Sequence, residues 1–219
     1  MELSQPLVVA GIGTDVGKTV ASAVLCELLG ADYWKPIASG TDDGPVDHQM
    51  MKALLNDGAA RIHEPKYVFG KSLSPHVAAS IEGVSIDLGT LLDIPVTQRC
   101  LVIELAGGLL VPLNDDCTNI DLLIRWNLPT VVVSRHYLGS INHTLLTVEA
   151  LKARNLSIAG IIFNGDELPD TERIIARLGS VPVLGRLPMV EQVTASTIRE
   201  LVASGVVGVP RGFKPKFSS

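Results

Sequence analysis

The chain has 219 residues, of which 47% are hydrophobic, 19% charged and 4% aromatic, and its formal net charge is −5. This composition excludes intrinsic disorder and leaves room for one domain, residues 1–219, with a large buried core. Because the net charge is negative and aromatic rings are few, we expect no nucleic-acid or membrane partner and favour a small-molecule ligand.

Apolar runs alternate with helical patterns along the whole chain. The runs predict buried strands at Pro6–Ala10, Tyr33–Pro36, Arg99–Ile103, Thr130–Val133, Ile158–Phe163 and Pro182–Leu184. The helical patterns lie at Lys18–Leu29, Pro75–Glu82, Ile120–Trp126, Ile141–Arg154, Asp170–Leu178 and Ala195–Ser204. This alternation indicates an α/β fold with a mainly parallel central sheet and helices on both faces. Ligands of such sheets bind at the carboxyl ends of the strands.

The stretch GIGTDVGKT, residues 11 to 19, joins the first strand to the first helix. A phosphate loop has Gly, four residues, then Gly-Lys-Ser/Thr, but here an isoleucine stands where the first Gly is expected. In a phosphate loop, Lys18 would reach the terminal phosphates and the Thr19 hydroxyl would bind Mg²⁺. A dinucleotide loop using Gly11, Gly13 and Gly17 gives no reason for that Lys-Thr pair, and an ordinary turn is the other alternative. We therefore favour a single-domain P-loop NTPase fold.

Two polar residues follow the second predicted strand in WKPIASG, residues 34 to 40. Lys35, at the ligand-facing end of the strand, could neutralise an anion or could extend its amine to solvent. Ser39 offers a hydroxyl in a turn. Asp47 opens the helical pattern that follows, where it could bind a metal or could be a first-turn acid.

Glu104 ends the run LVIE, which we predict to be the central strand. An unpaired carboxylate in so apolar a setting is costly, so we expect it to hold a metal or a water molecule. Gly107 follows and allows the backbone to pass close to a ligand. Asn164 ends a later strand, where its amide could recognise an adenine edge or could simply be a turn residue before Gly165.

The cysteines and the chain's first residues bear on location. Cys26, Cys100 and Cys117 form no Cys-x-x-Cys pair, so a disulfide framework or a zinc site has no support. The start MELSQPLVVAG has too short an apolar run for a signal peptide, and we expect a cytoplasmic protein. The basic end, residues 211–219, predicts a solvated tail.

Five segments in order resemble the dethiobiotin synthetase family over about residues 7 to 187. They are the loop with Gly11 and Gly17 six apart, YWKPIASG, LSPHVAASIEG, IELAGGLLVPL and LGSINHTLLT. The resemblance implies ATP-dependent closure of a ureido ring. CO₂ adds to 7,8-diaminononanoate as a carbamate, ATP phosphorylates it, and the second amine closes the ring.

The resemblance also implies roles for individual residues. ATP would be bound by Gly13, Thr14, Asp15, Val16, Gly17, Lys18, Thr19, Val20 and, at the adenine, Asn164. Mg²⁺ would be held by Thr19, Asp47 and Glu104, and the catalytic groups would be Lys35, Lys18 and Thr14. The substrate would contact Ser39, Lys35, Gly107 and the segment Gly139, Ser140, Ile141 and Asn142, which would receive its carboxylate near a homodimer interface.

Three positions depart from the family's commonest pattern: Gly13, Leu105 and Tyr137. Gly13 lacks the acidic or polar side chain often seen in the loop, and Tyr137 stands where a basic residue is expected. A rival interpretation is a nucleotide-dependent partner switch like the partition and positioning ATPases. Those proteins typically carry an extra loop lysine at the place where this chain has Gly13.

Overall fold

The computed structural model describes residues 5–214 and has a seven-stranded sheet in the order β4-β2-β6-β1-β7-β8-β9. Every neighbouring pair in this sheet runs parallel. A second, two-stranded parallel sheet joins β3 and β5. The strands are β1 (Leu7–Gly11), β2 (Asp32–Trp34), β3 (Ile37–Ser39), β4 (Ile62–His63), β5 (Tyr67–Phe69), β6 (Leu101–Gly108), β7 (Thr130–Arg135), β8 (Ile158–Asn164) and β9 (Val183–Leu187).

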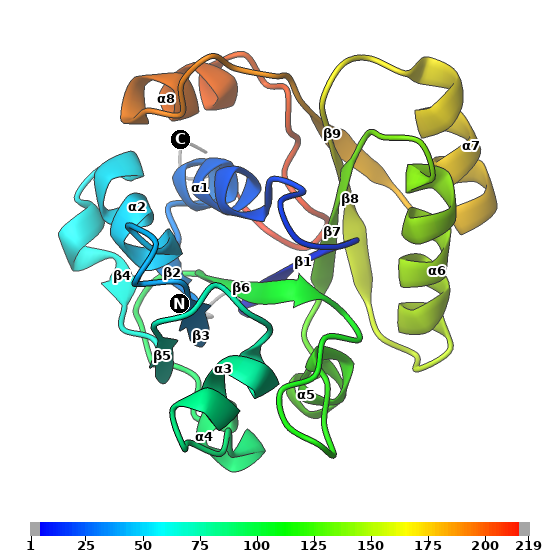
Figure 1. The fold of residues 1–219 in the computed structure, drawn as a ribbon. Coiled ribbons are helices and arrows are strands. Elements are labelled where there is room, and N and C mark those ends of the chain that lie inside the picture. Colours follow the sequence, from blue (N-terminus) through cyan, green and yellow to red (C-terminus); the bar gives the residue numbers. More distant parts are fainter. Residues whose placement is uncertain (1–4, 215–219) are drawn as a thin grey trace.

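Helices connect these strands and cover the sheet, which confirms the predicted α/β fold. They are α1 (Lys18–Leu29), α2 (Asp47–Leu54), the short 3-10 turn η1 (Gly58–Ala60), α3 (Pro75–Ile81), α4 (Leu88–Leu92), α5 (Asn119–Trp126), α6 (Ser140–Lys152), α7 (Pro169–Gly179) and α8 (Ala195–Ala203). Figure 1 shows α1, α2 and α8 on one side of the sheet and α3, α4 and α5 on the other.

The central strand β1 separates two hydrophobic cores. Leu7 and Val9 pack with residues of α1, α2 and α8, whereas Val8 and Ala10 pack with residues of α4, α5 and α6. This division follows from the two-residue side-chain period of a strand, which sends successive residues to opposite faces. Burial on both faces is why the strands read as continuous apolar runs.

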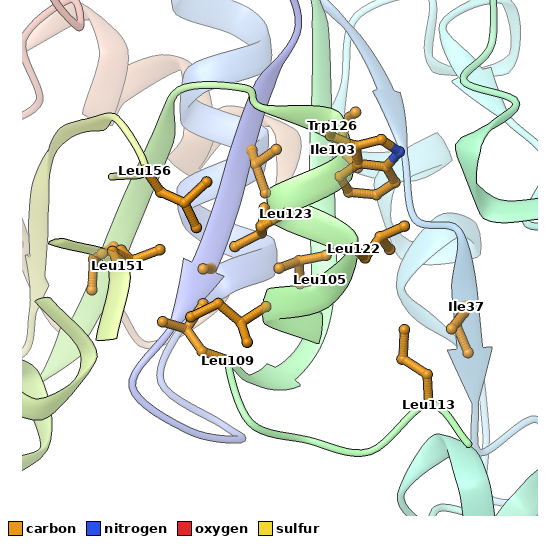
Figure 2. Close-up of a cluster of buried hydrophobic side chains, with 14 of the residues drawn as sticks. Ile37, Ile103, Leu105, Leu109, Leu113, Leu122, Leu123, Trp126, Leu151 and Leu156 are labelled. Carbon is orange, nitrogen blue, oxygen red and sulfur yellow. The ribbon is translucent and has the colours of Figure 1, made fainter. Parts of the chain in front are cut away.

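Strand β6 is third in the sheet order, beside β1, so the prediction that it is the central strand is wrong. It carries Leu105, one of the three departures from the pattern of the family that the sequence resembles. Figure 2 shows Ile103 and Leu105 of β6 among side chains of α5, including Leu122, Leu123 and Trp126. Leu105 is 1% exposed. Leu105 therefore packs in the core, and β6 continues beyond it to Gly108.

A buried ion pair ties the carboxyl end of α1 to the segment that follows α2. Arg61 pairs with Glu27 and donates hydrogen bonds to the Cys26 and Ala31 carbonyls at 2.7 and 2.6 Å. Glu27 also accepts from the Asn56 backbone N–H at 3.1 Å. The last carbonyls of a helix need such donors, so this network fixes the relative placement of α1 and α2.

The carboxyl end differs in part from the predicted solvated tail. Phe213 is 8% exposed and packs in the core that contains α1 and α8, so the prediction is wrong for this residue. Residues 215–219 of the predicted tail lie outside the described residues. The single-domain organisation stays a prediction. Within residues 5–214, no helix combines the length and the apolar character needed to cross a membrane.

Candidate functional site

A cleft of about 890 Å³ lies where β1, β2 and β6 end, as expected for a parallel sheet. The loop after β1, the start of α1, the residue after β2, the start of α2 and the end of β6 all contribute to it. Its lining brings together most of the predicted site residues, namely Thr14, Asp15, Gly17, Lys18, Thr19, Val20, Lys35, Ser39, Asp47, Glu104 and Gly107.

The side chain of Lys18, at the start of α1, reaches back to the loop between β1 and α1. The Lys18 ammonium donates to the Gly13 carbonyl at 2.8 Å, and burial lowers the pKa of this side chain. Asp15 and Gly17 both have positive φ, at 54° and 93°. An ideal Cβ on Gly11 would lie 2.7 Å from Val16, whereas nothing lies within 4 Å of one on Gly13. Gly11 and Gly17 are thus required sterically, and Gly13 is not.

Asn164 of β8 supports this loop from the neighbouring part of the sheet. Its side-chain Nδ2 donates to the Val16 carbonyl at 2.9 Å. A Cβ added to Gly17 would overlap the same amide. Asn164 therefore lies beside the loop and not in a remote turn. Val16, whose carbonyl accepts from Asn164, is buried.

Gly17→Ala should weaken nucleotide binding. The left-handed backbone at Gly17 and the overlap with Asn164 would each disfavour alanine, at roughly 1–3 kcal/mol for the backbone alone. We expect about tenfold weaker binding of a non-hydrolysable ATP analogue in a calorimetric titration. Gly13→Ala is the matched control because its Cβ would meet open space. Equal effects of the two substitutions would contradict the steric account.

Four charged or polar side chains meet at the bottom of the cleft. The Thr19 hydroxyl lies 2.6 Å from Asp47 Oδ1 and 3.1 Å from Glu104 Oε1. The Lys35 ammonium contacts Asp47 Oδ2 and lies 3.2 Å from Glu104 Oε1. Asp47 and Glu104 are 57 positions apart in sequence, yet the end of β2, the middle of β6 and the start of α2 bring both to one lysine.

The charges in this cluster stabilise one another. Burial by itself would lower the pKa of Lys35, but Glu104 and Asp47 outweigh it and raise the pKa above its ordinary value. Burial likewise opposes ionisation of Asp47, but the Lys35 charge and the hydrogen bonds to Asp47 lower its pKa. The cluster therefore favours the charged forms of the Lys35 ammonium and the Asp47 carboxylate.

The oxygen donors of the cluster fit a hard divalent cation. Thr19, Asp47 and Glu104 offer one hydroxyl and two carboxylates, the ligand chemistry that Mg²⁺ prefers. In the part of the chain that the structure describes, no group of three or more His, Cys, Asp or Glu residues could hold a metal alone. A cation here would need phosphate oxygens and water to complete its shell, which is the usual arrangement for Mg²⁺ with a nucleotide.

A second cavity of about 420 Å³ adjoins the cleft and shares Thr14 and Val111 with it. Its lining is mostly apolar and includes Leu109, Leu146 and the His143 side chain of α6. Gly13, a predicted nucleotide contact, lines this cavity rather than the cleft.

The predicted segment Gly139–Asn142 lies at the start of α6, outside the lining of both cavities. The Ser140 N–H donates to the Tyr137 carbonyl at 2.9 Å, so this predicted substrate donor is already engaged. The Tyr137 hydroxyl lies 2.7 Å from His143 Nδ1. Tyr137 thereby extends the polar surface of α6 beside the second cavity.

Tyr33, for which the sequence predicted no role, lies in this site. Its hydroxyl lies 3.1 Å from Glu104 Oε2, and the residue is fully buried. The signal in the sequence was that Tyr33 precedes Lys35 by two positions in the predicted strand Tyr33–Pro36, and such residues share a face.

Solved structures match the fold at low sequence identity. A ParA family ATPase from Chlorobium tepidum matches with a TM-score of 0.54 and 13% identity, covering 91% of this chain and 98% of that one. The MinD cell division protein of Aquifex aeolicus matches with a TM-score of 0.50 and 12% identity, covering 91% and 97%. At these identities the likeness shows the fold alone.

Sequence relatives are much more similar. The chain is 46% identical to the ATP-dependent dethiobiotin synthetase BioD of Afipia carboxidovorans, over 90% of this chain and 93% of that protein. The enzyme of the same name from Nitrobacter hamburgensis is 46% identical over 93% and 95%, and that of Christiangramia forsetii 47% identical over 82% and 85%. A family model described as an AAA domain matches residues 5–197. The chain thus belongs to the AAA domain family and to the family of ATP-dependent dethiobiotin synthetases.

Proposed function

We propose that this protein is an ATP-dependent cyclo-ligase that joins CO₂ to 7,8-diaminononanoate and closes the ureido ring of dethiobiotin, releasing ADP and phosphate in biotin biosynthesis. The observation that carries the proposal is the cluster at the bottom of the cleft. Lys35 meets Asp47 and Glu104 there, next to Thr19 and the Lys18 loop.

The reaction divides into three balanced steps. One amine of the diamine attacks CO₂ and loses a proton, which gives a carbamate. A carbamate oxygen then attacks the terminal phosphorus of ATP, and ADP leaves. The second amine attacks the carbonyl carbon of this mixed anhydride and loses a proton, and phosphate leaves as the ring closes. Each step needs aligned reactants and neutralised oxygens, so no protein nucleophile is required.

Lys35 and Lys18 supply the positive charge for these steps. Lys35 is 7% exposed and faces the cleft, so we assign it to the carbamate and to the phosphoryl group in transfer. Fixed positive charge in a site with little water stabilises the charge that develops there. Lys18 would neutralise the terminal phosphates, and Thr14 and Ser39, also in the cleft, would contact the diamine or carbamate.

The nucleotide would occupy the loop. Backbone N–H groups from Gly13 to Val20 would bind its phosphates, with the positive end of the α1 dipole behind them. Asn164 already donates to the loop through Nδ2, and we assign its side chain to the adenine edge. Mg²⁺ would be held by Thr19, Asp47 and Glu104, where it would neutralise phosphate oxygens.

The second cavity suits the rest of the substrate. An apolar space beside Thr14 and Val111 fits a methylene chain whose amines enter the cleft. We assign Gly107, at the cleft, and the backbone of Gly139, Ile141 and Asn142 to the substrate, the last three to its carboxylate.

Exposed apolar residues near this cavity support the predicted homodimer. Leu110, Leu138 and Leu146 are 62%, 103% and 55% exposed. A second copy covering them would bury apolar surface next to the proposed carboxylate site. The cytoplasmic location stays a prediction.

Coupled measurement of ADP release tests the proposed activity. Release should require ATP, Mg²⁺, bicarbonate and 7,8-diaminononanoate together, and omission of any one should return the rate to background. A chromatographic assay should show dethiobiotin in an amount equal to the ADP formed. ADP release that continues at the same rate without the diamine would contradict the proposal.

A further inference from the structure

The parallel pairing of β2 with β6 places Tyr33 on the same face as Glu104. Tyr33 is opposite Val102 in the register, and Glu104 follows Val102 by two positions. Residues two apart on a strand share a face, and a diagonal neighbour is within reach of a long aromatic side chain. The Tyr33 hydroxyl accordingly donates to Glu104 Oε2 at 3.1 Å, and both residues are buried.

The two oxygens of the Glu104 carboxylate have separate partners. Oε2 accepts from Tyr33, whereas Oε1 accepts from Thr19 at 3.1 Å and from Lys35 at 3.2 Å. The last torsion of a glutamate is broad and nearly twofold, so an unheld carboxylate would turn easily. Tyr33 is the partner on the side away from the cleft, and its hydrogen bond fixes the plane of the carboxylate so that one oxygen faces Thr19 and Lys35.

The hydroxyl is suited to hold a carboxylate at this position. An ordinary tyrosine hydroxyl carries its proton at neutral pH, and here it donates that proton to Glu104 Oε2. A donating hydroxyl orients the Glu104 carboxylate without adding a positive charge beside it.

We propose that Tyr33 is a positioning residue that presents Glu104 to the nucleotide-bound metal through one oxygen and thereby favours Mg²⁺ over Ca²⁺. This inference rests on the proposed function. Mg²⁺ demands a near-ideal octahedron with short bonds, at about 2.0–2.1 Å, whereas Ca²⁺ accepts longer bonds and two oxygens of one carboxylate. A carboxylate held with one oxygen toward the cleft can form the single short bond that Mg²⁺ requires. Its other oxygen is bound by Tyr33 and is therefore not offered to Ca²⁺.

The test is cation binding by Tyr33→Phe, which keeps the buried ring and removes only the hydroxyl. Each protein is loaded with a non-hydrolysable ATP analogue and titrated calorimetrically with Mg²⁺ and, separately, with Ca²⁺. We expect Mg²⁺ affinity to fall about tenfold, as is typical when a partner of a metal ligand is lost. Ca²⁺ affinity should fall less, so the ratio of Mg²⁺ affinity to Ca²⁺ affinity should decrease. Binding of the analogue without metal should not change.

Tyr67→Phe is the matched control. The Tyr67 hydroxyl accepts from the Asp87 N–H at 3.0 Å, outside the cleft lining. Both variants should lose a few degrees of melting temperature, because each leaves one hydrogen-bonding group without its partner. Only Tyr33→Phe should change the ratio of the two cation affinities.

An unchanged ratio in Tyr33→Phe would overturn the positioning role and show a purely structural hydrogen bond. Failure of Tyr33→Phe to fold, when Tyr67→Phe folds, would also overturn it, because the hydroxyl would then be needed for the fold itself. These outcomes are separate from the proposed reaction, since the titration contains no diamine or bicarbonate. If the wild-type protein shows the cation preference but no diamine-dependent ADP release, this inference stands and the proposed function is contradicted.

Discussion

Lys35→Ala should lower diamine-dependent ADP release by about 10²–10³-fold, the usual effect of removing one preorganised group that stabilises developing charge. Lys35 is buried, and its ammonium contacts the carboxylates of Asp47 and Glu104. Among the described residues that line the cleft, the other lysine, Lys18, is hydrogen-bonded to the Gly13 carbonyl. The rate is measured by coupled ADP release at saturating ATP, and the decrease should appear in kcat.

Weaker nucleotide binding and misfolding must be excluded as causes of this lower rate of ADP release. An ATP analogue should still bind Lys35→Ala within a fewfold of wild type, since the loop and Lys18 remain. Lys52→Ala is the control, because Lys52 forms an exposed ion pair with Glu64 and lies outside the cleft lining. Full turnover by a folded Lys35→Ala protein would refute the assignment of Lys35 to the transferring group.

Glu104→Gln should reduce turnover by at least about 100-fold and weaken Mg²⁺ binding to the nucleotide complex. The side chain keeps its size, but an amide nitrogen replaces one carboxylate oxygen. Glu104 accepts from Thr19, Lys35 and Tyr33, so the new N–H₂ group would face a donor on whichever side it turned. At least one donor then loses its acceptor on this side chain in a buried setting, and the negative charge is lost.

The dependence of the rate on Mg²⁺ concentration provides the measurement. Saturation by Mg²⁺ should move to higher concentrations in Glu104→Gln. Glu64→Gln is the matched control, since the Glu64 side chain is 72% exposed and pairs with Lys52 at 3.1 Å. Unchanged Mg²⁺ saturation in Glu104→Gln would remove Glu104 from the metal site.

The long elements could be predicted well because their signals are local. Helix α1 has the bounds expected from the sequence, Lys18–Leu29, and left-handed glycines flank it on both sides, at Gly17 and Gly30. The buried strands could be recognised because both faces are apolar. Strand β6 ends at Gly108 rather than Ile103, since pairing with β1 extends the strand past its last fully apolar stretch.

The short elements could not be predicted. Strands β3 and β5 have three residues each, too few for a periodic pattern, and they exist because they pair with each other. Phe213 looked like part of a polar tail because its packing partners lie in distant helices.

The prediction of site residues was limited in the same way, because contacts between residues far apart in sequence leave no local pattern. The loop and Lys35 carried recognisable motifs, but Tyr33 and Glu104 are 71 positions apart, and only the register of β2 on β6 brings them together.

The support that Asn164 gives to the loop also sets an order of events during synthesis. Val16 and Asn164 are 148 positions apart, so the ribosome makes the loop long before it makes β8. At typical translation rates the delay is on the order of ten seconds. We expect the nascent chain to hold ATP poorly during that interval, and competence to bind nucleotide to arise only as β8 emerges and pairs with β7.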